Sequence, residues 1–233
     1  MKARIPRPRA VLFDLFHTLV TVRPQGVDIP PTWVDLGLPR EAYEKRWFDD
    51  DDGRATGRIK DPVEVIRLVI HDIDPTISME RIEWASRRRA RRFEEALTTV
   101  EPATVAAVER LHLAGVRMVL VSNACYGEIE AWPRSPLAPY FDAALFSCHV
   151  GMVKPDRKFY EHALERAGAA PHEAIFVGDG GSDEHRGARA VGLQTALVTR
   201  HASQWWPEKM EPRKKLVDWT FDDVPAFVEA LDL

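Results

Sequence analysis

This chain of 233 residues has few cysteines, no long apolar run and no excess of positive charge. Its two cysteines, Cys125 and Cys148, are too few for a disulfide scaffold or a cysteine-rich zinc site. No apolar run approaches the roughly 18 residues of a membrane-spanning helix. The net charge of −4 gives no general electrostatic reason to bind nucleic acid or an anionic membrane. We therefore expect a cytoplasmic protein that has neither nucleic acid nor a membrane as a partner.

Short apolar runs alternate with helical patterns along most of the sequence. The runs predict buried strands at Ala10–Phe13, Val116–Val121, Ala143–Phe146, Ala174–Val177 and Thr195–Val198. The helical patterns lie at 104–114, 158–167 and 184–191, and a glycine closely follows each one. Strands that are apolar throughout and alternate with helices are typical of a parallel sheet covered on both faces. The sequence predicts an α/β fold with a doubly wound, Rossmann-like sheet.

Two parts of the chain depart from this alternation. Residues 21–100 contain no comparable strand-like run but show helical patterns at Arg40–Phe48, Pro62–Ile73 and Ser78–Leu97. We expect an α/β core of residues 1–20 and 101–233 and an inserted helical module of residues 21–100. The polar segment His201–Leu216 predicts a loop, and Val217–Leu231 predicts a last strand and helix.

Polar side chains directly follow several of the predicted strands. Asp14, Ser122 and Asp179 come at strand ends, with Asn123 and Lys154 close by in sequence. Ligands bind outside the carboxyl ends of the strands in open α/β sheets. Converging carboxylates need a cation, and Mg²⁺ prefers oxygen ligands. An Asp carboxylate can act as a nucleophile, while a lysine and a hydroxyl can bind an anionic group. Together these groups predict phosphoryl transfer.

Four short motifs carry a family resemblance. In order along the chain they are Phe13–Leu19, Val121–Asn123, Lys154–Asp156 and Gly178–Glu184, the last followed by Gly187–Ala190. Together they resemble the four motifs of the haloacid dehalogenase-like hydrolase superfamily, and the order and spacing fit from Ala10 to about Thr199. The helical insertion stands where that superfamily carries its cap domain. A cap that closes over the site implies a small-molecule substrate.

The resemblance implies catalytic and substrate-binding roles. Asp14 is the expected nucleophile, and Lys154 neutralises both the nucleophile and the incoming anion. Ser122 holds the transferred group together with neighbouring backbone N–H groups. Ser122, Asn123 and Lys154 are the predicted substrate contacts.

The resemblance also implies a Mg²⁺ site. Its expected ligands are Asp14, the backbone carbonyl of Phe16, Asp179 and Asp183. The family uses acidic residues at either of two spacings, so Glu184 is the alternative to Asp183. We expect a monomer or a homodimer.

Phe16 departs from the phosphatase pattern, which has a second Asp at this position to protonate the leaving alcohol. Losing that acid costs about 10²- to 10⁴-fold in rate. The 2-haloacid dehalogenases have an aromatic residue here and use no metal, whereas Asp179 and Asp183 favour Mg²⁺. The sequence predicts a Mg²⁺-dependent hydrolase of a small phosphorylated metabolite, acting through an aspartyl-phosphate. A carbon–halogen hydrolase of the dehalogenase kind and a weakly active or non-catalytic binding protein are the alternatives.

His17 has two interpretations. It is either a substitute acid/base, because an imidazole titrates near neutral pH, or a turn residue that points away from Asp14. Trp205 and Trp206 likewise either anchor a partner or pack against the chain's own core.

Overall fold

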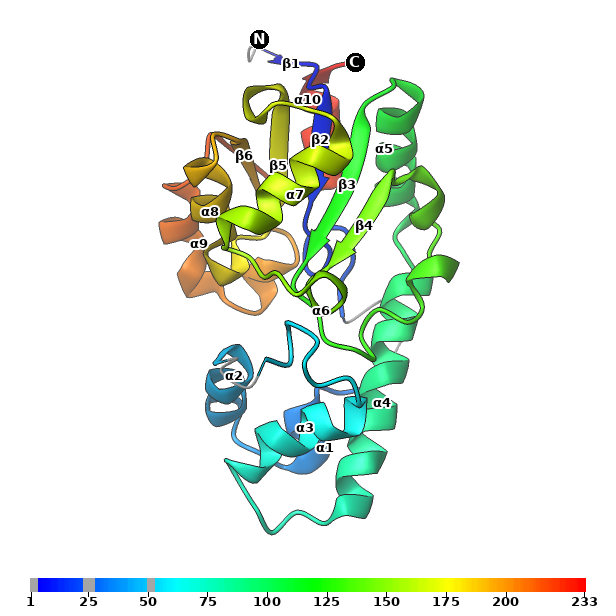
Figure 1. The fold of residues 1–233 in the computed structure, drawn as a ribbon, viewed down its shortest axis with the longest axis vertical. Helices are drawn as coiled ribbons and strands as arrows, with labels where there is room; N and C mark the ends of the chain where they lie inside the picture. Colours follow the sequence, from blue (N-terminus) through cyan, green and yellow to red (C-terminus); the bar gives the residue numbers. More distant parts are fainter. Residues whose placement is uncertain (1–3, 23–27, 50–52) are drawn as a thin grey trace.

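The computed structural model describes residues 4–22, 28–49 and 53–233. Its main sheet has six parallel strands in the order β4-β3-β2-β5-β6-β7. The strands are β2 (Ala10–Phe13), β3 (Arg117–Ser122), β4 (Ala143–Phe146), β5 (Ala174–Gly178), β6 (Gln194–Val198) and β7 (Trp219–Phe221). A parallel pair of two-residue strands, β1 (Ile5–Pro6) and β8 (Leu231–Asp232), lies near the two termini (Figure 1). The predicted doubly wound sheet is confirmed.

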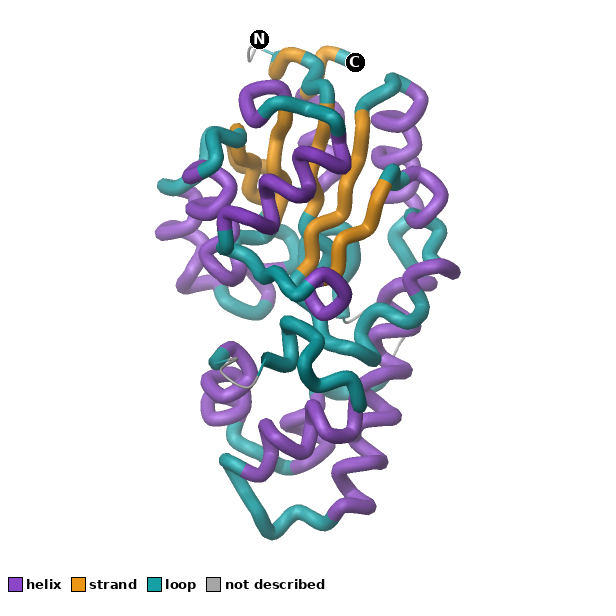
Figure 2. The backbone as a smooth tube through the Cα atoms, in the orientation of Figure 1, coloured by secondary structure: helices purple, strands orange, loops and turns teal. Residues whose placement is uncertain are grey.

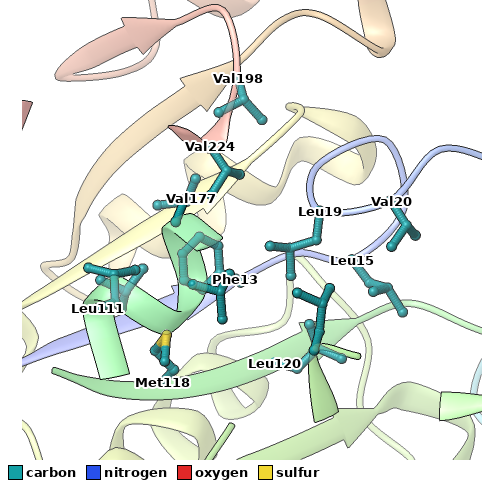
Figure 3. Packing of buried hydrophobic residues seen from close by; sticks show 14 of the residues in the cluster. Phe13, Leu15, Leu19, Val20, Leu111, Met118, Leu120, Val177, Val198 and Val224 are labelled. Atoms are coloured by element: carbon teal, nitrogen blue, oxygen red, sulfur yellow. The ribbon is translucent and has the colours of Figure 1, made fainter. Parts of the chain in front are cut away.

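Side chains point alternately to the two faces of the sheet along each strand, and here both sets are apolar. Helices therefore cover both faces. Ala10 and Leu12 of β2 face α7 (Arg157–Ala167) and α8 (Glu184–Ala190). Val11 and Phe13 face the opposite layer, formed by α5 (Pro102–Leu113) and α10 (Val224–Ala230). Figure 3 shows Phe13 packed among Leu111, Met118, Val177 and Val224 in this second layer.

A helical cap, defined here as helices α1–α4, lies beyond the carboxyl edge of the sheet (Figures 1 and 2). Its helices are α1 (Thr32–Leu36), α2 (Arg40–Phe48), α3 (Pro62–His71) and α4 (Met79–Thr98). Asp61 caps α3 by accepting a hydrogen bond from the Val63 N–H, and Ser78 caps α4 in the same way. Apolar faces of these helices form a separate core around Val69 and Ile70.

The predicted loop at His201–Leu216 is wrong. It contains a 3-10 turn at Ala202–Gln204 and the helix α9 (Pro207–Lys214). Only Met210 of α9 is buried, so the helix has no apolar stripe that a sequence pattern could reveal. The prediction also missed α1 and the short helix α6 (Ser147–Val150).

None of the helices in the described ranges is both long and apolar enough to cross a membrane.

Candidate active site

The candidate site lies where the strand order of the sheet reverses. The chain runs from β2 outward to β3 and β4, then returns to β5 on the other side of β2. Asp14 follows β2 and Asp179 follows β5, so the two carboxylates leave from adjacent strands. Open α/β sheets bind ligands at such a switch point. A cavity of about 700 Å³ opens between the sheet and the cap, and both carboxylates line it.

A tight loop after β2 fixes the predicted nucleophile. The Asp14 N–H donates to the Val177 carbonyl at 2.9 Å, which continues the pairing of β2 with β5. Thr18 Oγ1 donates to Asp14 Oδ2 at 2.7 Å. The loop closes where the His17 N–H donates to the Val20 carbonyl at 2.6 Å. Thr18 therefore orients the buried carboxylate, a role that the motif alone does not reveal.

Lys154 joins the nucleophile to a second carboxylate. Its Nζ lies 2.5 Å from Asp14 Oδ1 and 2.7 Å from Glu184 Oε2, and its side chain is buried. Burial opposes the charged form, but the two carboxylates outweigh burial and raise the pKa of Lys154 above its usual value. The ammonium is therefore held in its charged form against Asp14.

Asn123 holds the backbone of Lys154 from both sides. Asn123 Nδ2 donates to the Lys154 carbonyl at 3.0 Å, and Asn123 Oδ1 accepts from the Lys154 N–H at 2.8 Å. Asn123 also lines the cavity. The amide thus has a positioning role that was not foreseen, while its contact with substrate stays a prediction.

Three buried carboxylates converge at the site. Asp14, Asp179 and Glu184 each offer an oxygen, and these atoms all lie within 4.8 Å of one another. Burial raises the pKa of Asp14, with Lys154 opposing the shift and Asp179 adding to it. Burial likewise raises the pKa of Glu184 to about 8. A hard divalent cation suits such a set of oxygen ligands and relieves their repulsion, so the residues fit Mg²⁺.

The loop after β5 brings Glu184, and not Asp183, into this cluster. Ser182 and Asp183 both have positive φ, at 51° and 49°, and α8 begins at the next residue. Asp183 lines the cavity but is exposed. Glu184 Oε1 accepts from the Gly180 N–H at 2.7 Å, which turns its side chain inward. The predicted contribution of the Phe16 carbonyl stays a prediction.

Arg213 adds a second cation that no motif indicates. It comes from α9, the helix that the sequence pattern missed. Arg213 Nη1 donates to the Asp179 carbonyl at 2.9 Å and lies 3.3 Å from Asp179 Oδ2. The site therefore combines three carboxylates with Lys154 and Arg213.

Ser122 ends β3 and is completely buried. Its Oγ meets no hydrogen-bond partner within the described ranges, and the residue is not part of the cavity wall there. The binding of the transferred group by Ser122 stays a prediction. Ser147 directly follows β4, and unlike Ser122 it has a hydrogen-bond partner. Its Oγ accepts from the Ala124 N–H at 2.9 Å.

Aromatic side chains line much of the cavity. The cap contributes Trp33, Tyr43, Trp47, Phe48 and Phe93, and the core contributes Phe16, Trp205 and Trp206. The Phe16 and Phe93 rings meet edge to face, with centroids 5.0 Å apart. Trp205 and Trp206 contact cap residues: Trp206 Nε1 lies 3.4 Å from Glu44 Oε2, and Arg40 Nη2 donates to the Trp205 carbonyl at 2.9 Å. The tryptophan pair therefore packs within the chain.

His17 lines the cavity beside the same tryptophans. Its ring centroid lies 5.3 Å from that of Trp206 and 6.0 Å from that of Trp205. Its φ of 65° places it in the left-handed region. Its Nδ1 is buried without a hydrogen-bond partner in the described part of the chain, and burial lowers the pKa of the ring to about 4. His17 is a turn residue whose ring is neutral at pH 7, so the ring can accept a proton but is not charged to donate one. Its role as a substitute acid/base stays a prediction.

Comparison with known proteins identifies the class. The family model of the haloacid dehalogenase-like hydrolases matches residues 8–192. The chain is 29% identical over 127 residues to glyceraldehyde 3-phosphate phosphatase of Methanopyrus kandleri, a match of 54% of this chain and 50% of that protein. It is 26% identical over 232 residues to phosphoglycolate phosphatase 1 of Pseudomonas aeruginosa, covering 97% of this chain and 82% of that protein.

One solved structure shows the same fold. L-2-haloacid dehalogenase from Xanthobacter autotrophicus matches with a TM-score of 0.64 at 18% identity, over 95% of this chain and 97% of that one. At this identity the likeness concerns the fold alone. The chain spans about half the length of the phosphatase from Methanopyrus kandleri. From the family match, the chain belongs to the haloacid dehalogenase-like hydrolases.

Proposed function

We propose that the protein is a Mg²⁺-dependent hydrolase of a small phosphorylated metabolite that acts through an aspartyl-phosphate on Asp14. The observation that carries this proposal is the convergence of Asp14, Asp179 and Glu184, with Lys154 bonded to two of them. The similarity to two phosphatases supports the same reaction class.

In this mechanism the residues around Asp14 prepare it for attack. Thr18 fixes one carboxylate oxygen, and Lys154 favours the ionised form of the carboxyl group against the effect of burial. An oxygen of Asp14 attacks phosphorus, the bond to the leaving group breaks, and an acyl phosphate forms. Water then hydrolyses the acyl phosphate, releases phosphate and restores the carboxylate.

Asp14, Asp179 and Glu184 are the proposed Mg²⁺ ligands. Bound Mg²⁺ would neutralise charge on these carboxylates and on the phosphoryl oxygens. The proposed division into a core (1–20 and 101–233) and a cap (21–100) lets the cap cover the substrate and exclude water. A cavity of about 700 Å³ favours a small molecule over a polymer.

Phe16 favours the second candidate, a carbon–halogen hydrolase. A phenyl ring supplies no proton, and a halide leaves without one. The carboxylate cluster is the reason to rank this reaction second, because halide displacement by Asp14 does not need a divalent cation.

The test compares two substrates with Mg²⁺ and with EDTA. We expect hydrolysis of 4-nitrophenyl phosphate that needs Mg²⁺ and is lost in Asp14→Asn. The matched control is Asp232→Asn, a removal of an exposed carboxylate near the C-terminus. Chloride release from 2-chloropropionate that is indifferent to EDTA would replace the proposal with the second candidate.

Calorimetry gives a readout that is independent of turnover. We expect Mg²⁺ to bind the wild-type protein and to bind Asp179→Asn at least about tenfold more weakly. Equal affinities would remove Asp179 from the proposed site.

A further inference from the structure

Position 16, on the wall of the cavity that holds Asp14, carries a phenyl ring that cannot protonate a departing alcohol. Phe16 lines the cavity two residues after the nucleophile, and its ring is held edge-on against Phe93. An alkoxide is a poor leaving group because its conjugate acid, an alcohol, is about as weak an acid as water. A phenolate needs far less help, because a phenol has a pKa of about 10. This chemistry favours an ester whose leaving group departs as a stable anion.

Part of the wall of the cavity that holds Asp14 is made of aromatic rings from three separate segments. Phe16 follows β2, Trp47 and Phe48 end α2, and Trp206 precedes α9. The Phe48 and Trp206 rings meet with centroids 6.4 Å apart, which closes the wall between cap and core. Such surfaces bind a flat apolar group by stacked or edge-to-face contact.

Among the residues of this wall, Phe48 has the side chain that the rest of the protein buries least. Its side chain lines the cavity and yet is 61% exposed. Most large apolar residues of the cap, such as Val69 and Ile70, are buried in the cap's own core. An exposed ring at the cavity gains its contacts when a ligand covers it.

We propose that the substrate is an aryl phosphate, a phosphate monoester whose leaving group is a phenol. The ring lies against the aromatic wall and the phosphoryl group faces Asp14. This inference rests on the proposed phosphatase function, and it names the substrate class of that site. It joins two features: the lack of an acidic group on the side chain at position 16, and the rings of Trp47, Phe48 and Trp206 on the cavity wall.

The reaction balances without a proton donor. Asp14 attacks phosphorus, the bond between phosphorus and the aryl oxygen breaks, and the electron pair leaves on the phenolate oxygen. Water then attacks the acyl phosphate, which yields inorganic phosphate and the free Asp14 carboxylate. The proton released from water goes to the phenolate or to solvent.

Four phosphates separate the ring from the leaving group. Phenyl phosphate has a ring and a stable leaving anion, and benzyl phosphate has a ring but leaves as an alkoxide. Acetyl phosphate has a stable leaving anion without a ring, and ethyl phosphate has neither. We expect kcat for phenyl and acetyl phosphate to exceed that for benzyl and ethyl phosphate by about 10²- to 10⁴-fold. We expect the two ring compounds to have the lower KM values.

Phe48→Ala tests the aromatic wall directly. Loss of one ring contact of about 0.5–1.5 kcal/mol raises the ratio of KM for phenyl phosphate to KM for acetyl phosphate by roughly 2- to 12-fold at 1.4 kcal/mol per tenfold. The matched control is Leu113→Ala on α5, an apolar residue that is 79% exposed and outside the cavity wall. We expect this control to leave the ratio unchanged.

The outcomes separate this inference from the proposed function. Suppose that Asp14-dependent hydrolysis of acetyl phosphate is seen but KM for phenyl phosphate is no lower than KM for acetyl phosphate. This result would overturn the inference and leave the proposed phosphatase function in place. Equal KM ratios in Phe48→Ala and the wild-type protein would overturn the aromatic site. Failure to hydrolyse any of the four phosphates would overturn both proposals.

Discussion

Replacing Phe16 with Asp is expected to give the site a carboxylic acid two residues after the nucleophile. The backbone of Phe16 is fixed by its bridge to Val20, so a new carboxyl group enters a defined position two residues after the nucleophile. The side chain lines the same cavity as Asp14, so the new carboxyl group would border the space that a substrate occupies. Phe16→Asp should therefore accelerate the release of alcohols more than the release of phenols.

The expected size of the effect follows from general acid catalysis. A positioned acid contributes about 10²- to 10⁴-fold when the leaving group needs a proton. We expect kcat for benzyl phosphate to rise by this factor and kcat for phenyl phosphate to change much less. The variant also loses the edge-to-face contact of Phe16 with Phe93, at centroids 5.0 Å apart. Such a contact is worth about 0.5–1.5 kcal/mol, so unfolding in urea should show a loss of at least that size.

Steady-state phosphate release from both compounds, with Mg²⁺ present, measures the effect. Phe16→Asn is the matched control, because it makes a similar change in size and polarity but cannot protonate an alkoxide. A rise in benzyl phosphate turnover that is the same in the Asp and Asn variants would refute the reasoning. A rise of equal size for phenyl and benzyl phosphate would refute it as well.

Two further predictions test the charge arrangement of the site, and a third tests the burial of Cys148. Glu184→Gln should weaken Mg²⁺ binding at least about tenfold in calorimetry, whereas Asp183→Asn should change it little; the reverse order would contradict the observed carboxylate cluster. Lys154→Met should lower the free energy of unfolding by about 3–5 kcal/mol in urea without Mg²⁺, because it leaves buried charges unpaired, and an unchanged midpoint would contradict this. Burial raises the pKa of Cys148 to about 11, so iodoacetamide at pH 8 should modify it far more slowly in the native protein than in urea; equal rates would contradict its burial.

The core sheet could be predicted because its strands carry their own signal. Ala10–Phe13 and Ala143–Phe146 are apolar at every position, and the structure has strands with the same bounds. Parallel strands covered on both faces leave such uninterrupted runs. The chemistry-bearing residues Asp14 and Asp179 then stand directly after β2 and β5, so their convergence followed from the fold.

The rest of the site depends on tertiary contacts that no local pattern encodes. Arg213 reaches Asp179 from a helix that is polar on nearly every face. Asn123 uses its amide on the backbone of Lys154, a residue that lies 31 positions away in the sequence. The choice of Glu184 over Asp183 follows from two positive φ angles in the preceding turn. Spacing alone permits either residue.

The balance of charge at the site links the metal to the substrate. In the limit of full ionisation, Asp14, Asp179 and Glu184 carry −3, while Lys154 and Arg213, which contact them, supply +2, so this cluster of five side chains carries −1. A cluster of that charge repels a phosphate dianion, and burial strengthens the repulsion because charges are poorly screened there. A divalent cation would bring the site to +1 and so reverse the sign of its interaction with phosphate. The change of sign favours Mg²⁺-dependent phosphate chemistry over displacement of a halide from an organic monoanion. Lys154 and Arg213 share one role, because both offset part of the negative charge of the carboxylate cluster.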